Sequence, residues 1–395
     1  MTNKLTDKVT LRHGAVLNNR VAMSPMQSQS GKRNGFVSDD TLKYYGARSQ
    51  AGGLIVTEFH YVSENGGPAY HPGYPEQLAA YSDAHLDGLT KLATTIKKDG
   101  NKAILQIHHA GRAAVGQALS GQDVVAPSAI DFDFLSYPIR TLTEQEIEDI
   151  IQDFGRATSR AIKAGFDGVE IHGANHYLIQ QFFSALSNHR TDKWGGSFEK
   201  RMAFPLAVVK EVKRVVAEEA PSNFIIGYRL SPEEIHGSEV GYDYKEAIAL
   251  VTEIVKNELD YIHLSLWGGY QSTPSGVDQS YAALFKNVLD DETKLFAVGG
   301  VFDEESAKDA VENYTDIVVV GRGTLIDPQF GRKIQEGRGN EIFHEISPEN
   351  MAYVSWTEGL KEAFTREDSL GLPPLPGGET IRHLHTGRYD MLGKK

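Results

Sequence analysis

The chain has 395 residues, of which 40% are hydrophobic and 9% aromatic, so it can bury a sizeable core, and disorder of the whole chain is excluded. Its formal net charge of -13 offers no basic field to nucleic acid or to an anionic membrane surface, and it favours a small-molecule partner. The absence of cysteine excludes disulfides, thiolate nucleophiles and cysteine-ligated metal or iron–sulfur centres, so any redox chemistry requires a bound cofactor.

The N-terminal segment, Met1 to Gly14, is polar and lacks the apolar core of a signal peptide. No apolar run of the sequence approaches the length of a membrane span. We therefore expect a cytoplasmic location.

Short apolar runs recur along the chain, each bounded by glycine or polar residues and each followed by a segment with helical spacing. This alternation is typical of a parallel sheet. The runs that we expect to form strands are Val21–Met26, Leu54–Phe59, Ala103–Ile107, Gly168–His172, Phe224–Leu230, Tyr261–Leu266, Leu295–Gly299 and Ile317–Gly321.

The clearest expected helix is Thr143–Ala164, which begins with a capping box of Thr143 and Glu146. Its apolar residues repeat along one face: Ile147, Ile150, Ile151, Phe154, Ala157 and Ala161. Four other segments have similar spacing: Asp83–Lys98, Phe198–Glu219, Tyr244–Asn257 and Glu304–Glu312. Strands alternating with helices in this number predict an α/β fold, a closed (β/α)8 TIM barrel. An open doubly wound sheet would need a glycine-rich turn after its first strand, and Pro25–Ser28 provides none.

No linker or fixed-period repeat divides the sequence, so we expect one barrel domain over residues 1–345. Gly111–Leu142, between the third strand and its helix, is expected to be a lid-like insertion, with Phe132, Phe134 and Tyr137 exposed. Residues 346–395 form a C-terminal extension whose proline-rich part, 372–378, is not helical. This extension is expected either to pack on the barrel or to contact another copy in a homo-oligomer.

Functional groups of a β/α barrel lie at the C-terminal ends of its strands. The loops after strands seven and eight, which commonly hold a phosphate, begin with Gly299-Gly300 and Gly321-Arg322. Glycine lets the backbone approach closely, and the Arg322 guanidinium can pair with a phosphate. The alternative is that these glycines only turn the chain.

Gln106 and Arg229 end strands on the inner side of the expected barrel. A buried amide can bind the edge of a flavin pyrimidine ring, and a fixed cation beside it would stabilise the negative charge of the reduced ring. Alternatively, Arg229 forms an ion pair with an acidic neighbour, such as Glu170 or Glu58.

The densest polar cluster at a strand end runs from Glu170 to Tyr177. His172 and Asn175 can both donate hydrogen bonds to one carbonyl or nitro oxygen, and Tyr177 can deliver a proton to a neighbouring carbon. The alternative is a rim of hydrogen-bonded polar side chains. His172 and His176 stand four apart, like two zinc ligands on a helix, but they lie at a strand end and Gly173 replaces the expected glutamate. We therefore expect no metal.

Four motifs resemble the old yellow enzymes, the FMN-dependent NAD(P)H:flavin oxidoreductases, over about residues 18–332. The motifs are Asn19–Met26, Leu105–Arg112, His172–Tyr177, and Leu186–Asp192 with the following Trp194–Ser197. The sequence departs from the family pattern at Gln27, where threonine or cysteine is usual, and at His176, where glycine is usual.

The resemblance implies an enzyme that binds FMN and uses NADH or NADPH as its reductant. Reduced flavin N5 would then pass hydride, in a ping-pong cycle, to the activated C=C bond of an unsaturated carbonyl or nitro compound. Tyr177 would donate the proton, and His172 and Asn175 would hold the substrate oxygen. The residues that would bind FMN are Ser24, Pro25, Met26, Gln27, Phe59, Gln106, His172, Arg229, Gly300, Gly321 and Arg322.

Two alternatives remain open from the sequence. One is another kind of FMN barrel, such as a 2-hydroxy-acid oxidase or a dihydrouridine synthase, although the acidic composition disfavours an enzyme that must hold tRNA. The other is a barrel that binds a ligand without turning it over, because a fold alone does not establish an activity.

Overall fold

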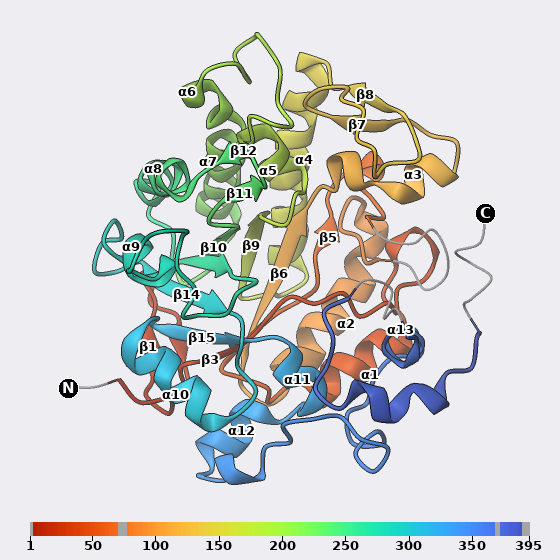
Figure 1. Ribbon diagram of the computed structural model, residues 1–395, viewed down its shortest axis with the longest axis vertical. Coiled ribbons are helices and arrows are strands. Elements are labelled where there is room, and N and C mark those ends of the chain that lie inside the picture. Colours follow the sequence, from red (N-terminus) through yellow and green to blue (C-terminus); the bar gives the residue numbers. More distant parts are fainter. Residues whose placement is uncertain (1–2, 70–76, 368–371, 389–395) are drawn as a thin grey trace.

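The structure, a computed structural model, describes residues 3–69, 77–367 and 372–388 of the chain. Within these residues, eight parallel strands form a closed ring at the centre of the molecule, surrounded by helices (Figure 1). The pairing of β4 with β6 closes the ring. The expected (β/α)8 barrel is confirmed. In ring order the strands are β3 (Val21–Met23), β4 (Leu54–Val56), β6 (Lys102–His108), β9 (Gly168–Gly173), β10 (Ile225–Leu230), β13 (Tyr261–Ser265), β14 (Lys294–Val298) and β15 (Ile317–Val320).

The N-terminal end of the barrel is closed by a hairpin of β1 (Val9–Thr10) and β2 (Val16–Leu17). Val9 and Leu17 pack in one buried cluster with strand residues such as Tyr261 and Phe296, whose rings stack at 4.0 Å. Apolar side chains fill this end of the barrel. Polar functional groups are therefore expected at the opposite end, where the C-terminal ends of the strands lie.

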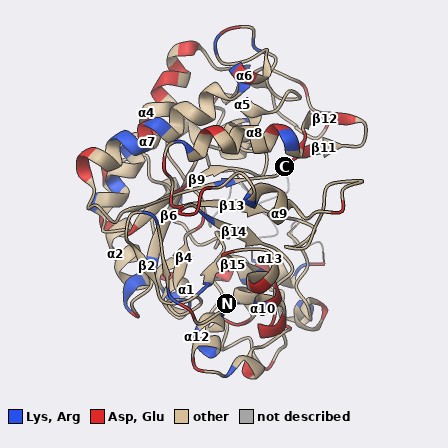
Figure 2. Ribbon diagram, turned by 90° about the vertical axis from the view of Figure 1, so that its left-hand side faces the viewer, with Lys and Arg blue, Asp and Glu red and all other residues tan. Residues whose placement is uncertain are grey.

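An outer layer of helices packs its apolar faces on the strands (Figure 2). The capping box predicted for the helix that begins after Thr143, α4 (Glu144–Lys163), is present, because Thr143 and Glu146 form reciprocal hydrogen bonds across its first turn. The expected helix at Asp83–Lys98 begins as a 3-10 turn, and the one at Phe198–Glu219 is two helices that meet at Met202. The larger helices are α1 (Asp39–Ala47), α2 (Leu86–Lys97), α4 (Glu144–Lys163), α7 (Ala203–Glu219), α8 (Tyr244–Val255), α10 (Glu304–Asn313) and α13 (Glu358–Thr365); the shorter are α3 (Val115–Leu119), α5 (Leu178–Phe183), α6 (Phe198–Arg201), α9 (Tyr281–Lys286), α11 (Arg322–Ile326) and α12 (Phe330–Gln335).

Phe154 lies at the centre of the buried face of α4 and is fully buried in the main core. Truncation to alanine removes the ring and leaves a cavity, so we expect Phe154→Ala to lower the free energy of unfolding by about 3–5 kcal/mol. Urea unfolding of the purified protein measures this loss. Gln145→Ala, on the exposed side of the same helix, is the matched control and should stay within about 0.5 kcal/mol of the parent. Equal losses in both variants would contradict this account of the core.

The insertion after β6 contains α3 and a small pair of strands, β7 (Val124–Ala126) and β8 (Ile139–Thr141). Phe134 is exposed, as expected, whereas the Tyr137 hydroxyl is half-buried and donates a hydrogen bond to the backbone carbonyl of Arg112. This contact lies within the insertion, and the backbone N–H of Arg112 in turn donates to the side-chain oxygen of Gln181 in α5 at 3.1 Å, which anchors the insertion to the barrel.

The described part of the chain after residue 345 lies on the barrel. Leu360 and Leu375 are buried in the same core cluster as the barrel strands. The fully buried guanidinium of Arg48, at the C-terminal end of α1, donates to the backbone carbonyl of Val354. The hydroxyl of Thr357 donates to the backbone carbonyl of Ser28. These contacts hold α13 close to the loop that follows β3.

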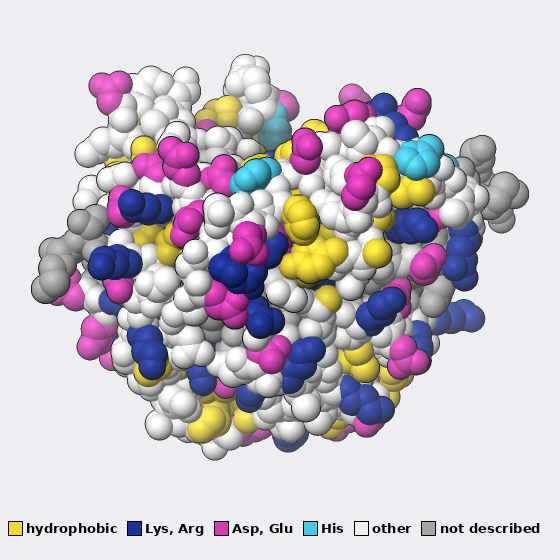
Figure 3. Space-filling model, turned by 90° about the horizontal axis from the view of Figure 1, so that it is seen from below, with side chains coloured by type: hydrophobic (Ala, Val, Ile, Leu, Met, Phe, Trp, Pro, Cys, Tyr) yellow, Lys and Arg dark blue, Asp and Glu magenta, His cyan; other side chains and the backbone are white. Residues whose placement is uncertain are grey.

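Charged side chains of both signs are interspersed on the face seen in Figure 3, without a field of one sign. No helix in the part of the chain that the structure describes combines the length and the hydrophobicity of a membrane span.

Candidate active site

A cavity of about 620 Å³ opens at the C-terminal ends of the barrel strands. Its wall includes most of the site residues that were predicted from the sequence, and these residues come from the ends of several strands. It is lined by Ser24, Pro25, Met26, Gln27, Phe59, Asn175, Tyr177, Arg229, Ser265, Leu266, Trp267, Val298, Gly299, Gly300, Val301, Phe302, Gly321, Arg322, Leu325, Leu360, Phe364, Leu372, Pro373 and Pro374.

The first strand is shorter than predicted, because its last residues leave the sheet to line this cavity. β3 ends at Met23, and the backbone of Ser24 makes one more hydrogen bond, to the carbonyl of Val320, before the chain turns away. In the same way β4 ends at Val56 and frees Phe59 for the cavity wall. The predicted strand ends at Met26 and Phe59 were therefore wrong by three residues each.

The two loops selected for a phosphate meet in one wall of the cavity. At Gly299 a Cβ atom would lie 2.5 Å from the carbonyl oxygen of Leu266, and Gly300 has a φ of 75°, so both positions require glycine. Arg322 begins α11 and faces the cavity from the other loop. The glycine backbone of these loops and the guanidinium of Arg322 therefore lie in the same wall of the cavity.

Beneath the cavity the buried side chains of Gln106, Glu170 and His263 form a hydrogen-bonded row. The Gln106 amide donates to one oxygen of Glu170 at 2.6 Å, and His263 lies 2.9 Å from the other. Burial raises the pKa of Glu170, but His263, Arg229 and Gln106 outweigh it and hold the pKa below its ordinary value. Glu170 is therefore a buried carboxylate.

Arg229 is buried at the edge of this row and donates to the Ser265 hydroxyl at 3.0 Å, while its Nε has no partner. Among the described residues no carboxylate lies within ion-pair distance of Arg229, so the predicted alternative of a direct ion pair with Glu170 or Glu58 is not formed. The Glu58 carboxylate instead accepts a hydrogen bond from Ser28. Arg229 thus keeps a charge directed at the cavity.

His172, Asn175 and Tyr177 come together at the end of β9. The His172 ring centroid is 5.2 Å from that of Tyr177 and 5.8 Å from that of Phe59, and both of these residues line the cavity. Burial, with the charge of Arg229, lowers the pKa of His172 well below its ordinary value, so the ring is neutral. Both ring nitrogens of His172 are buried without a partner, which is unusual for a buried polar group.

Asn175 is positioned by two hydroxyl groups. Its backbone N–H donates to Ser231 at 3.1 Å, and its side-chain oxygen accepts from Ser265 at 3.0 Å. Its φ of 56° is left-handed, a conformation that asparagine tolerates better than most residues. Because Ser265 bonds both Asn175 and Arg229, it links two of the predicted site residues.

Sequence reasoning missed Ser265 and Trp267, and it gave the C-terminal segment no place at the site. Trp267 is 76% exposed and stands at the cavity rim. The tail supplies Leu360, Phe364 and residues 372–374, and the Arg322 guanidinium donates to the Pro374 carbonyl at 2.6 Å. The tail therefore forms part of the cavity wall.

The insertion does not contribute to the lining of the cavity as the structure describes it. Its Tyr137 and Ile139 belong to a small apolar cluster that also contains Phe59 and Tyr177. The insertion consequently supports the cavity wall from outside at Tyr177.

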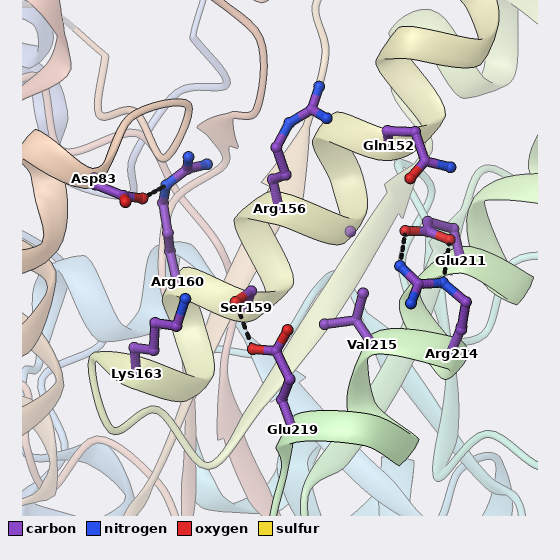
Figure 4. A pocket seen from close by; sticks show the side chains of 11 residues that line it. Asp83, Gln152, Arg156, Ser159, Arg160, Lys163, Glu211, Arg214, Val215 and Glu219 are labelled. Carbon is purple, nitrogen blue, oxygen red and sulfur yellow. Dashed lines mark hydrogen bonds and ion pairs between the residues drawn. The ribbon is translucent and has the colours of Figure 1, made fainter.

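A second hollow, of about 290 Å³, lies on the outer surface between α4 and α7 (Figure 4). Its charged side chains bond to one another: Arg160 to Asp83 at 2.8 Å, and Arg214 to Glu211 at 2.7 Å. In each pair a buried side chain, Arg160 or Glu211, meets an exposed partner, so these charges are already paired within the protein. This hollow is not a candidate site.

The pair His172 and His176, weighed as metal ligands from the sequence, is separated in the structure. His172 faces the aromatic rings of the cavity wall, whereas His176 lies beside Glu234 and His236. In the described residues no group of metal-ligating side chains contains His172.

Comparison with known proteins gives one matching family model, described as the NADH:flavin oxidoreductase / NADH oxidase family, over residues 9–341. The probable NADH-dependent flavin oxidoreductase YqiG of Bacillus subtilis (strain 168) is 42% identical over 340 residues, covering 86% of this chain and 89% of that protein. The NADH:acrylate oxidoreductase of Vibrio harveyi is 41% identical over 358 residues, covering 89% of this chain but only 35% of that longer protein.

Among solved structures, the old yellow enzyme homologue from Zymomonas mobilis superposes with a TM-score of 0.73 at 24% identity. The superposition covers 90% of this chain and 99% of that one. It supports the barrel described above.

Proposed function

Because the chain belongs to the NADH:flavin oxidoreductase / NADH oxidase family, we propose that it reduces the activated C=C bond of α,β-unsaturated carbonyl or nitro compounds. It is an NAD(P)H-dependent flavin oxidoreductase, and its cofactor is FMN. The name of the Vibrio harveyi relative supports the proposed substrate class, since acrylate is a C=C bond conjugated to a carboxylate.

The cavity fits FMN on grounds of its own. Its volume of about 620 Å³ lies inside the range of roughly 300–1,000 Å³ that small-molecule sites occupy. The side-chain oxygen of Gln106, the Nε of Arg229 and both nitrogens of His172 are buried without a partner. Such atoms are costly unless a ligand satisfies them, and a flavin pyrimidine ring offers both donors and acceptors.

We assign the cofactor to the residues expected from the sequence. The bare backbone at Gly300 and Gly321, with the Arg322 guanidinium, would hold the phosphate. Gln106, His172 and Arg229 would bind the pyrimidine edge of the ring, and Ser24, Pro25, Met26, Gln27 and Phe59 the remainder. When bound, FMN supplies hydride transfer between the nicotinamide and the substrate carbon.

The observation that carries the proposed reaction is the neutral, unpartnered His172 beside Asn175 and Tyr177. A neutral imidazole has one N–H to donate, and because Ser265 bonds the amide oxygen of Asn175, its NH₂ group is the donor that it offers. The two donors would bind one substrate oxygen and draw electrons from the conjugated C=C bond. Tyr177 would supply the proton to the adjacent carbon.

We also propose the division of the chain into a barrel, residues 1–345, and an extension, 346–395, that completes the cavity wall. The support is the contact between Arg322 and Pro374, together with the lining residues Leu360 and Phe364.

Rapid mixing without oxygen tests the function directly. The FMN-loaded protein should lose its flavin absorbance on mixing with NADH or NADPH and recover it on mixing with cyclohexenone or a nitroalkene. Recovery with quinones or oxygen alone, and with none of a panel of enones, nitroalkenes and unsaturated acids, would show a flavin oxidoreductase of another substrate class. NADH and NADPH are tested separately, so that the rate of flavin reduction by each nucleotide is measured.

A further inference from the structure

A second cluster of ligand-type side chains lies outside the cavity, between the turn after β9 and a hairpin after β10. The hairpin consists of β11 (Glu234–His236) and β12 (Glu239–Tyr242), next to α5 in Figure 1. His176 comes from the turn, and Glu234 and His236 come from β11. One ligand atom from each of the three lies within 4.8 Å of the others.

The carboxylate of Glu234 stands between the two rings. The distance from its Oε2 to His176 Nδ1 is 3.6 Å, and the distance from its Oε1 to His236 Nε2 is 3.8 Å. Glu234 and His236 are two residues apart on β11, and the pairing of β11 with β12 shifts register between Glu234 and Ile235. The two imidazole rings lie 5.4 Å apart. The geometry therefore converges on one point in front of Glu234.

Glu234 is a buried charge without a permanent cation. Its side chain is 2% exposed, and it accepts a hydrogen bond from Gln180 at 2.8 Å. No lysine or arginine in the described residues lies within ion-pair distance of it. A buried carboxylate of this kind calls for a positive partner.

We propose that His176, Glu234 and His236 bind a divalent transition-metal ion of the Zn²⁺ class. Two imidazoles and one carboxylate are a donor set that suits zinc, whereas Mg²⁺ and Ca²⁺ prefer oxygen ligands alone. Tetrahedral zinc with bonds of about 2.1 Å sets its donors roughly 3.4 Å apart, so the three atoms, now within 4.8 Å of one another, must approach by up to about 1.4 Å. Water completes the shell.

Small side-chain rotations suffice for this closure. The side chains of His176 and His236 are 46% and 53% exposed, while Glu234 is fixed by Gln180. His176 Nδ1 lies 3.2 Å from the Gln180 amide nitrogen and would exchange this contact for the ion. The backbone N–H of His176 is held by the same Gln180 at 3.0 Å. The ion would tie the hairpin to the turn that carries Asn175 and Tyr177. This inference is independent of the proposed function, since none of the three ligands lines the cavity.

Zinc titration of the untagged, FMN-loaded protein tests the site. Isothermal titration calorimetry with Zn²⁺ is expected to give one equivalent. His236→Ala, His176→Gly and Glu234→Gln should each weaken binding by at least about tenfold, because even partners outside a metal's own ligands contribute that much. Glycine is the replacement at residue 176 because the native φ is 63°.

The matched control is His13→Ala. His13 Nδ1 lies 2.9 Å from Asp260 Oδ2 at the opposite end of the barrel. The substitution therefore removes one histidine from a histidine–carboxylate pair that lacks a third ligand. Zinc binding should be unchanged in this variant. X-ray absorption at the zinc edge gives a second readout, in which histidine scattering should fall in His236→Ala. Binding that survives both exposed-histidine substitutions, or that the control loses equally, would overturn the proposal.

Discussion

Tyr177→Phe is expected to leave reduction of the bound flavin by NADH or NADPH near the parent rate and to slow its reoxidation by cyclohexenone by about 10²–10⁴-fold. The substitution keeps the ring, which packs against Phe59, His108 and His172, and removes only the hydroxyl. In the first half-reaction a hydride moves from nicotinamide and no carbon is protonated. In the second a carbon must receive a proton, so the loss falls there alone.

Rapid mixing of each half-reaction separately, followed by flavin absorbance, makes the measurement. The matched control is Tyr137→Phe, which removes a hydroxyl from the same apolar cluster but does not line the cavity. Ferricyanide, which accepts electrons without protonation of a carbon, should reoxidise Tyr177→Phe at the parent rate. Equal slowing of both half-reactions would mean that Tyr177 shapes the cavity and does not donate the proton.

The eight strands could be recognised from the sequence because a strand buried on both faces needs a run of apolar residues, and each run here is bounded by glycine or polar residues. Their ends were less certain for a physical reason. Met26 and Phe59 lie beyond the hydrogen-bonded ladder and line the cavity, although the local sequence still has the β-propensity of the strand before them.

The candidate site could be predicted where it follows the rule that barrel function lies after the strands. Ser265 ends β13 and would have been found by applying that rule to every strand. Pro374 and Leu372 could not, because their position depends on contacts across the chain, such as that with Arg322, and not on any local pattern. The same holds for the cluster at Glu234 and His176, whose members have no motif spacing.

Arg322→Ala is expected to weaken FMN binding by about 10- to 100-fold, since a charge-assisted hydrogen bond contributes about 1.5–3 kcal/mol. Arg322 stands beside the bare backbone of Gly300 and Gly321, and its guanidinium lies 5.2 Å from the Phe302 ring centroid. Quenching of flavin fluorescence on binding gives the dissociation constant. The FMN affinity of Arg322→Lys should lie between those of the parent and Arg322→Ala, because an ammonium group keeps the charge but lacks the planar geometry of the guanidinium.

Riboflavin, which lacks the phosphate, separates the two roles of this residue. Arg322 also holds the tail through the Pro374 carbonyl, so the alanine variant loses that contact as well. If the guanidinium binds the phosphate, the parent should prefer FMN to riboflavin, and Arg322→Ala should reduce that preference by about 10- to 100-fold, leaving the part that the backbone of Gly300 and Gly321 contributes. If the residue only holds the tail, both ligands should weaken by the same factor. Arg332→Ala, an exposed arginine paired with Glu336, should leave both affinities unchanged, which ties the effect to the position of the charge in the cavity wall.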